Sequence, residues 1–114
     1  MSHLFIELYK YKPAWLALPP AEREKVRSAV LEALTGLQAA GLEIIGWGAN
    51  DPATDLRADH DFFCVYRTPS PEFTRQFESG IRASGWHELF DQVALSGPAL
   101  SPAEVLALNV SYSA

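Results

Sequence analysis

The sequence is poor in cysteine, in basic residues and in long apolar runs, each of which particular classes of protein require. The 114 residues include one cysteine, nine lysines and arginines in total, and fourteen acidic residues. No apolar run approaches the ~20 residues of a membrane-spanning helix. The single cysteine, Cys64, excludes an internal disulfide and fits a reducing cytoplasm. The net charge of −5 and the scattered basic residues argue against nucleic acid as a partner. We expect no signal peptide, no membrane partner and a cytoplasmic location.

Motifs that specify a reaction are also missing. The sequence has no glycine-rich phosphate loop, no serine nucleophile elbow and no His-x-x-x-His or Cys-x-x-Cys spacing. Haem would need an axial ligand in a roomy cavity, and His60 or His87 could be that ligand. At this chain length we expect any cavity to be small. Cys64 lies within an apolar segment and is expected to be a buried small hydrophobe. We therefore predict neither a metal nor a cofactor.

Aromatic and apolar residues are plentiful, and their spacing predicts a single domain spanning residues 1–114. Apolar residues make up 48% of the chain, which is ordinary for a globular domain. Alternating patterns predict strands, and spacings of three and four predict helices. Pro20, Ser70-Pro71 and the Ser101-to-Glu104 capping box mark the helix starts. The predicted strands span residues 3–12, 42–47, 60–67 and 92–97, and the predicted helices span residues 20–40, 71–85 and 102–108.

The order strand, helix, strand, strand, helix, strand predicts a ferredoxin-like α+β fold. Such a fold has a four-stranded antiparallel sheet with two helices on one face. We interpret residues 13–20 as a connection, residues 86–90 as a short turn and residues 98–114 as an appendage. Within that appendage a short helix is followed, at residues 109–112, by a short strand or an ordered arm.

One sheet face should be left without a helical cover, and this predicts a dimer. We expect the uncovered face to carry Phe5, Tyr9 and Tyr11, which would expose too much apolar surface to water. Packing two such faces together would bury them and give a homodimer, a dimeric α/β barrel.

Three segments of the chain resemble a family of short bacterial proteins of unknown function. They are FIELYKYKPAWLALP near the start, DHDFFCVYRTP in the middle and SGWHELFDQV near residue 90, and the likeness covers roughly residues 3–97. That family belongs to the dimeric α/β-barrel superfamily, so the resemblance implies a ferredoxin-like fold and a dimer. The superfamily includes cofactor-free monooxygenases, small-ring isomerases, haem-binding enzymes and ligand-sensing domains, so it implies no single activity.

Two groups of side chains could carry acid–base chemistry. His60 stands between Asp59 and Asp61 and could be a general base. The alternative is that the three residues form only the polar mouth of a strand, since neighbours in a strand point to opposite faces and His60 cannot share a face with both acids. Glu7 lies on the aromatic side of the first strand with Tyr9. It could be a carboxylate whose pKa is raised by burial, or it could form a pair across the dimer contact.

Aromatic residues could form the wall of a pocket. We predict a homodimer that binds a small apolar ligand, with cofactor-independent oxygenase or isomerase chemistry on an aromatic substrate if it is an enzyme. His60, Glu7 and Tyr9 would be catalytic. A non-catalytic assembly or ligand-sensing domain is the alternative, in which the tryptophans complete the core. The predicted substrate-binding residues are Trp15, Trp47, Tyr66, Trp86 and His87.

Overall fold

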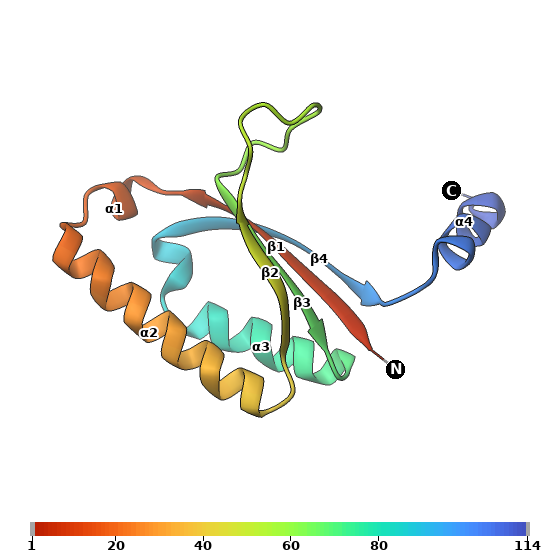
Figure 1. Cartoon of the computed structure of the whole chain (residues 1–114), viewed down its shortest axis with the longest axis horizontal. Coiled ribbons are helices and arrows are strands. Elements are labelled where there is room, and N and C mark those ends of the chain that lie inside the picture. The colour runs from red at the N-terminus through yellow and green to blue at the C-terminus, as the bar shows by residue number, and fades with distance from the viewer. Residues whose placement is uncertain (1, 114) are drawn as a thin grey trace.

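The computed structural model describes residues 2–113 and has the predicted ferredoxin-like α+β architecture (Figure 1). Four antiparallel strands form one sheet in the order β2-β3-β1-β4, and helices α2 and α3 lie together on one side of it. A one-turn 3-10 helix at Trp86–Glu88 precedes β4. The strands are β1 (His3–Tyr11), β2 (Glu43–Ala49), β3 (Phe62–Thr68) and β4 (Phe90–Pro98), and the helices are α1 (Pro13–Leu16), α2 (Pro20–Ala39), α3 (Pro71–Ala83) and α4 (Pro102–Ser111).

The helix starts follow the predicted capping chemistry. The Ser70 hydroxyl accepts a hydrogen bond from the amide of Phe73 at 3.1 Å, and Ser101 and Glu104 form a reciprocal capping box. Most element ends differ from the prediction by one or two residues, and at two places the type of structure differs. Residues 13–16 form the short helix α1 instead of an irregular connection, and residues 109–111 continue α4 instead of forming a strand.

The prediction of which sheet face is uncovered was wrong. Phe5 and Tyr9 are buried beneath the helices, and the rings of Phe5 and Phe77 of α3 meet edge to face at 5.5 Å. The alternation in β1 separates two apolar sets, but it does not say which set the helices cover. The set that contains Phe5 and Tyr9 lies under the helices, because its large aromatic side chains are long enough to reach from the sheet to the helices. The uncovered face carries the aliphatic set and its cross-strand neighbours: Leu4, Ile6, Leu8, Phe63, Val65, Val93 and Leu95.

Helix α3 is attached to the sheet much more closely than α2. Thr74 of α3 is fully buried, and its hydroxyl lies 2.6 Å from that of Thr68 and 3.2 Å from Nδ1 of His3. Phe77 packs on Phe5 and on Tyr66. Helix α2 has no fully buried residue. The sheet, α3 and the more distant α2 therefore enclose a space.

Gly48 of β2 is required by the ring that covers it. A Cβ at this position would lie 2.4 Å from Cζ of Phe63, whereas a Cβ at Gly46 in the same strand would meet nothing within 4 Å. We expect Gly48→Ala to lower the free energy of unfolding by about 1–2 kcal/mol, because the Phe63 ring must move. Gly46→Ala is the matched control and should stay within about 0.5 kcal/mol of the wild type in urea unfolding. Equal effects of the two substitutions would contradict the close contact.

Candidate functional site

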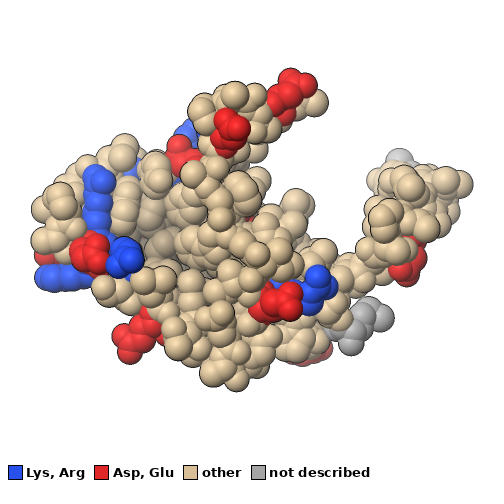
Figure 2. All heavy atoms as spheres, viewed as in Figure 1, with Lys and Arg blue, Asp and Glu red and all other residues tan. Residues whose placement is uncertain are grey.

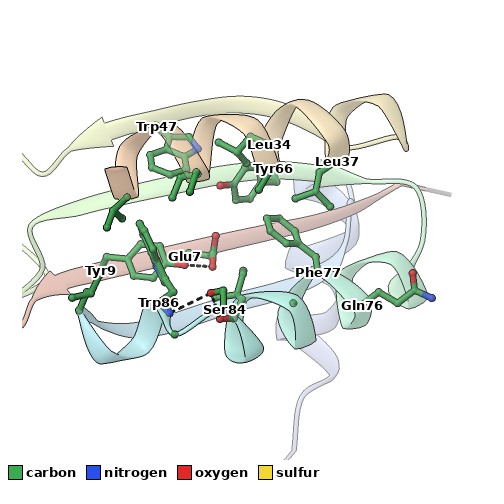
Figure 3. A pocket seen from close by; sticks show the side chains of 18 residues that line it. Glu7, Tyr9, Leu34, Leu37, Trp47, Tyr66, Gln76, Phe77, Ser84 and Trp86 are labelled. Atoms are coloured by element: carbon green, nitrogen blue, oxygen red, sulfur yellow. Dashed lines mark hydrogen bonds between the residues drawn. The ribbon is translucent and has the colours of Figure 1, made fainter. Parts of the chain in front are cut away.

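A cavity of about 510 Å³ lies between the sheet, α2 and α3 (Figure 3). This volume is within the range of small-molecule sites. The sheet contributes Glu7, Tyr9, Trp47 and Tyr66. Apolar side chains of the two helices and the ring of Trp86 complete the wall: Val26, Val30, Leu34, Leu37, Phe77 and Ile81.

The local sequence explains why these side chains face one another. Glu7 and Tyr9 are two residues apart in β1 and so point to the same side of the sheet. In β2 the register shifts between Ile44 and Gly46, and Trp47 then pairs with Cys64 on the helical side. The apolar stripe of α2 borders the cavity, and none of its residues is buried.

Glu7 is the chemically distinctive residue of the cavity. Of the described residues that line it, Glu7 alone carries a formal charge, and its side chain is only 1% exposed. The hydroxyl of Tyr9 donates to Oε2 of Glu7, and Nε2 of Gln92 donates to the same oxygen at 2.8 Å. The amide oxygen Oε1 of Gln92 lies 2.5 Å from Nε2 of His87. If His87 donates there, the Gln92 amide is oriented with its NH₂ group toward Glu7.

Burial raises the pKa of Glu7 to about 7. The hydrogen bond from Tyr9 opposes this shift, the negative charge of Glu78 adds to it, and the hydrogen bond from Gln92 again opposes it. Burial also raises the pKa values of Tyr9 and Tyr66, so both phenols keep their protons at neutral pH. The cavity thus contains a carboxyl group that can both take and give a proton near pH 7, beside neutral hydroxyl groups.

The two oxygens of Glu7 have different surroundings. Tyr9 and Gln92 both donate their hydrogen bonds to Oε2. Figure 3 shows the other oxygen directed away from Tyr9 and into the cavity. A proton transferred between Glu7 and a bound molecule would therefore be carried by Oε1.

The structure brings five of the predicted site residues together and leaves the others elsewhere. Glu7, Tyr9, Trp47, Tyr66 and Trp86 line the cavity. The remaining three of the predicted residues lie outside it: Trp15, His60 and His87.

Trp15 and His87 occupy other parts of the molecule. The Trp15 ring packs on Phe90 at 4.9 Å, with the Arg23 guanidinium 5.3 Å from its centre. His87 borders a separate, polar hollow, where it contacts Gln92. Sequence reasoning missed Gln92 as a site residue, since only the β1–β4 register, which pairs it with Tyr9, brings it to Glu7.

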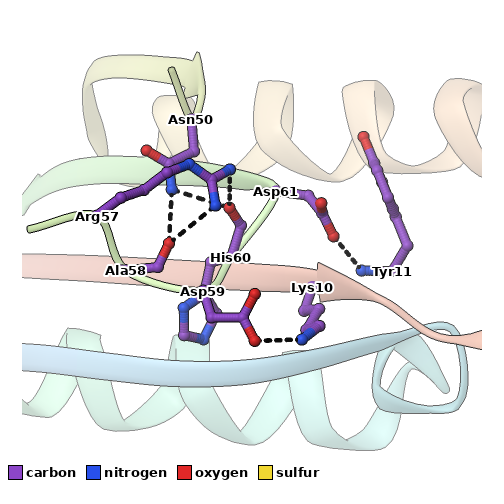
Figure 4. A network of polar contacts seen from close by, with 8 residues as sticks. All are labelled: Lys10, Tyr11, Asn50, Arg57, Ala58, Asp59, His60 and Asp61. Carbon is purple, nitrogen blue, oxygen red and sulfur yellow. Dashed lines mark hydrogen bonds and ion pairs between the residues drawn. The ribbon is translucent and has the colours of Figure 1, made fainter. Parts of the chain in front are cut away.

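The loop that carries His60 is organised by its own polar contacts (Figure 4). Asp59 pairs with Lys10 at 2.6 Å, and Asp61 accepts a hydrogen bond from the backbone amide of Tyr11 at 2.9 Å. Both carboxylates that flank His60 in the sequence therefore have other partners. Nδ1 of His60 is buried without a hydrogen-bond partner within the described chain. The role of His60 as a base stays a prediction, and His60 is not among the described residues that line the cavity.

The described residues contain no group of three or more histidine, cysteine or acidic side chains able to hold a metal ion. The cavity wall includes no histidine, cysteine or methionine among the residues that the structure describes there. These side chains are common axial ligands of haem iron, so the wall does not fit a histidine-ligated haem.

No helix within residues 2–113 is both long and apolar enough to cross a membrane.

These features define a ferredoxin-like α+β protein with an apolar cavity between its sheet and helices and a single buried carboxyl group in it. The chain belongs to a family of unknown function, DUF6616, whose model matches residues 2–112. No curated protein matches it.

Solved structures show the same fold. A chlorite dismutase mutant from Candidatus Nitrospira defluvii superposes with a TM-score of 0.68 at 15% identity, covering 93% of this chain and 43% of that one. The same enzyme in complex with imidazole gives 0.67 at 15% identity, with the same coverage. The chain thus spans less than half the length of chlorite dismutase. A dimeric ferredoxin-like protein of unknown function from Thermobifida fusca gives 0.55 at 23% identity, covering 87% of this chain and 92% of that one.

Proposed function

We propose that this protein is a homodimer that binds a small apolar molecule in the cavity and that Glu7 transfers a proton to or from it. The observation that carries the proposal is the single buried carboxyl group, with a pKa of about 7, in a cavity lined mainly by apolar side chains. A carboxyl group is rarely buried without a role, and one that titrates near neutral pH is suited to general acid–base catalysis.

The chemistry that fits best is an isomerisation by proton transfer. The ionised Oε1 of Glu7 would take a proton from a carbon next to a carbonyl group, and the electron pair of the broken C–H bond would move into that carbonyl. The neutral hydroxyl of Tyr66, which also lines the cavity, could donate a hydrogen bond to the resulting enolate oxygen. In a substrate with a C=C bond next to that carbon, the electron pair would then re-form the carbonyl group and shift the C=C bond, and Glu7 would return the proton to the far carbon of the original C=C bond. This sequence balances without an oxidant, whereas an oxygenation of the same carbanion would require O₂ as a second substrate.

The dimer would form through the uncovered sheet face. That face carries seven large apolar side chains, and Val93 and Leu95 are 51% and 65% exposed. Continuous exposed apolar surface of this kind is typical of interaction sites. A face with the same residues on both copies is suited to a two-fold contact. The ferredoxin-like protein from Thermobifida fusca, which is similar in length, is described as dimeric, and this supports a dimer for the present chain.

Filling the cavity from the helix side tests whether it binds ligands. We expect Gly80→Leu to weaken binding of the neutral fluorescent probe N-phenyl-1-naphthylamine at least tenfold, because Gly80 lines the cavity and a Cβ there meets nothing within 4 Å. Gly36→Leu is the matched control, since Gly36 is also helical, also has open space beside it, and lies outside the cavity. Fluorescence titration measures both. Equal affinity of the two variants would show that the probe binds elsewhere and would contradict the proposal.

A further inference from the structure

Helix α4 stands clear of the rest of the protein. Figure 1 shows it at the end of an extended link beyond β4, away from the sheet and from α2 and α3. Within residues 2–113, the last backbone hydrogen bond between this segment and the sheet runs from the amide of Ala99 to the carbonyl of Ser2, at 3.1 Å. The hydrogen bonds that follow it along the chain are internal to α4 and its caps.

The surface of α4 is unsuited to water. Leu106, Leu108 and Val110 are 61%, 58% and 89% exposed, and Glu104 is the only charged residue of the helix. Figure 2 accordingly shows this part of the molecule almost without charged side chains. A helix that is apolar on most sides is normally buried against something. A ten-residue helix is also too short to be stable alone in water, even with the capping box at Ser101.

The position of α4 indicates what covers it. In Figure 1 the loop at residues 50–61 and α4 both project on the side of the sheet opposite to α2 and α3. They therefore flank the uncovered apolar face described above. A second copy seated on that face would lie between these two projections and would come within reach of α4. In a two-fold dimer each copy would receive the α4 of the other.

We infer that α4 is an exchanged arm, which in the homodimer packs its apolar side chains against a second copy of this chain. The inference rests on the proposed dimer and adds a separate claim, that residues 102–111 form part of its interface. Two exchanged helices would also explain how an apolar segment without partners in its own chain is kept out of water. Exchange of an end segment between identical copies is a common route to a stable dimer.

A charge on α4 provides the first test. We expect Leu106→Glu in the full-length protein to raise the dimer dissociation constant at least tenfold in sedimentation equilibrium. Leu16→Glu is the control, because Leu16 has the same exposed fraction of 61% and belongs to α1, which in Figure 1 lies at the opposite end of the molecule from α4. An unchanged dissociation constant for Leu106→Glu would overturn the inference, and the dimer itself would still stand.

Hydrogen exchange of the unmodified protein provides a second test, which does not depend on how the variant folds. We expect the amides of residues 102–111 to become more protected as the protein concentration rises through the dissociation constant. Fast exchange at every concentration, or protection that persists in the monomer, would overturn the exchanged arm. A protein that stays monomeric at all concentrations would overturn the dimer as well, so the two failures are distinguishable.

Discussion

Replacing Glu7 with glutamine is expected to raise the free energy of unfolding by about 3 kcal/mol at pH 8 and to change it little at pH 4. Glu7 is 1% exposed and has a pKa of about 7 in the folded protein, against 4.5 for a glutamate in water. A shift of this size corresponds to roughly 3 kcal/mol, at about 1.4 kcal/mol per pH unit. Glutamine has nearly the same shape, and its carbonyl oxygen can still accept hydrogen bonds from Tyr9 and Gln92.

The direction of the pH dependence follows from which state holds the proton. Below about pH 4.5, Glu7 is protonated in both the folded and the unfolded chain, so its burial has no ionisation cost. Between about pH 4.5 and 7 the unfolded chain loses the proton while the folded chain keeps it. The contribution of Glu7 to stability is therefore fully present at low pH, decreases as the pH rises through this window, and levels off above it.

Urea unfolding of the wild type and the variant at several pH values between 4 and 8 measures this difference. Glu32→Gln is the control, because Glu32 is exposed on α2, and its substitution should have no comparable pH-dependent effect. A difference between wild type and Glu7→Gln that is the same at pH 4 and pH 8 would show that Glu7 is not a carboxyl group with a raised pKa. Once a substrate is known, the same variant should also have lost proton transfer, because an amide cannot act as the base.

The fold could be predicted from the sequence because local signals and chain order agree. Capping residues and hydrophobic spacing placed the four strands and the main helices, and their order leaves few possible topologies. The orientation of the sheet could not be predicted in the same way. In β1 the two alternating sets, one around Ile6 and the other around Tyr9, are both apolar enough to be buried.

The site was only partly predictable for a related reason. Glu7 and Tyr9 are two residues apart in one strand, so their shared face could be inferred from the sequence. Gln92 is 85 residues from Glu7 along the chain, and only strand pairing brings the two side chains together. The Asp-His-Asp segment around His60 suggested catalysis by composition alone, and in the structure its carboxylates are occupied by loop contacts.

Placing a positive charge on the uncovered sheet face is expected to break the proposed dimer. Leu95→Arg should raise the dimer dissociation constant at least 100-fold, which corresponds to about 2.7 kcal/mol at roughly 1.4 kcal/mol per factor of ten. Leu95 pairs with Ile6 in the middle of the β1–β4 ladder and is 65% exposed in the single chain. The isolated chain can therefore accept an arginine there. In the dimer, by symmetry, two arginines would be buried without partners.

Leu31→Arg is the matched control for this substitution. Leu31 lies on α2, on the opposite side of the sheet, and is 50% exposed without lining the cavity. Sedimentation equilibrium of both variants, with circular dichroism as a check on folding, separates loss of the dimer from loss of structure. A folded Leu95→Arg variant that dimerises as tightly as the wild type would exclude this sheet face as the contact. The apolar side chains on β1, β3 and β4 would then need a different partner, because a contiguous, partly exposed apolar patch of this kind is typical of an interaction site.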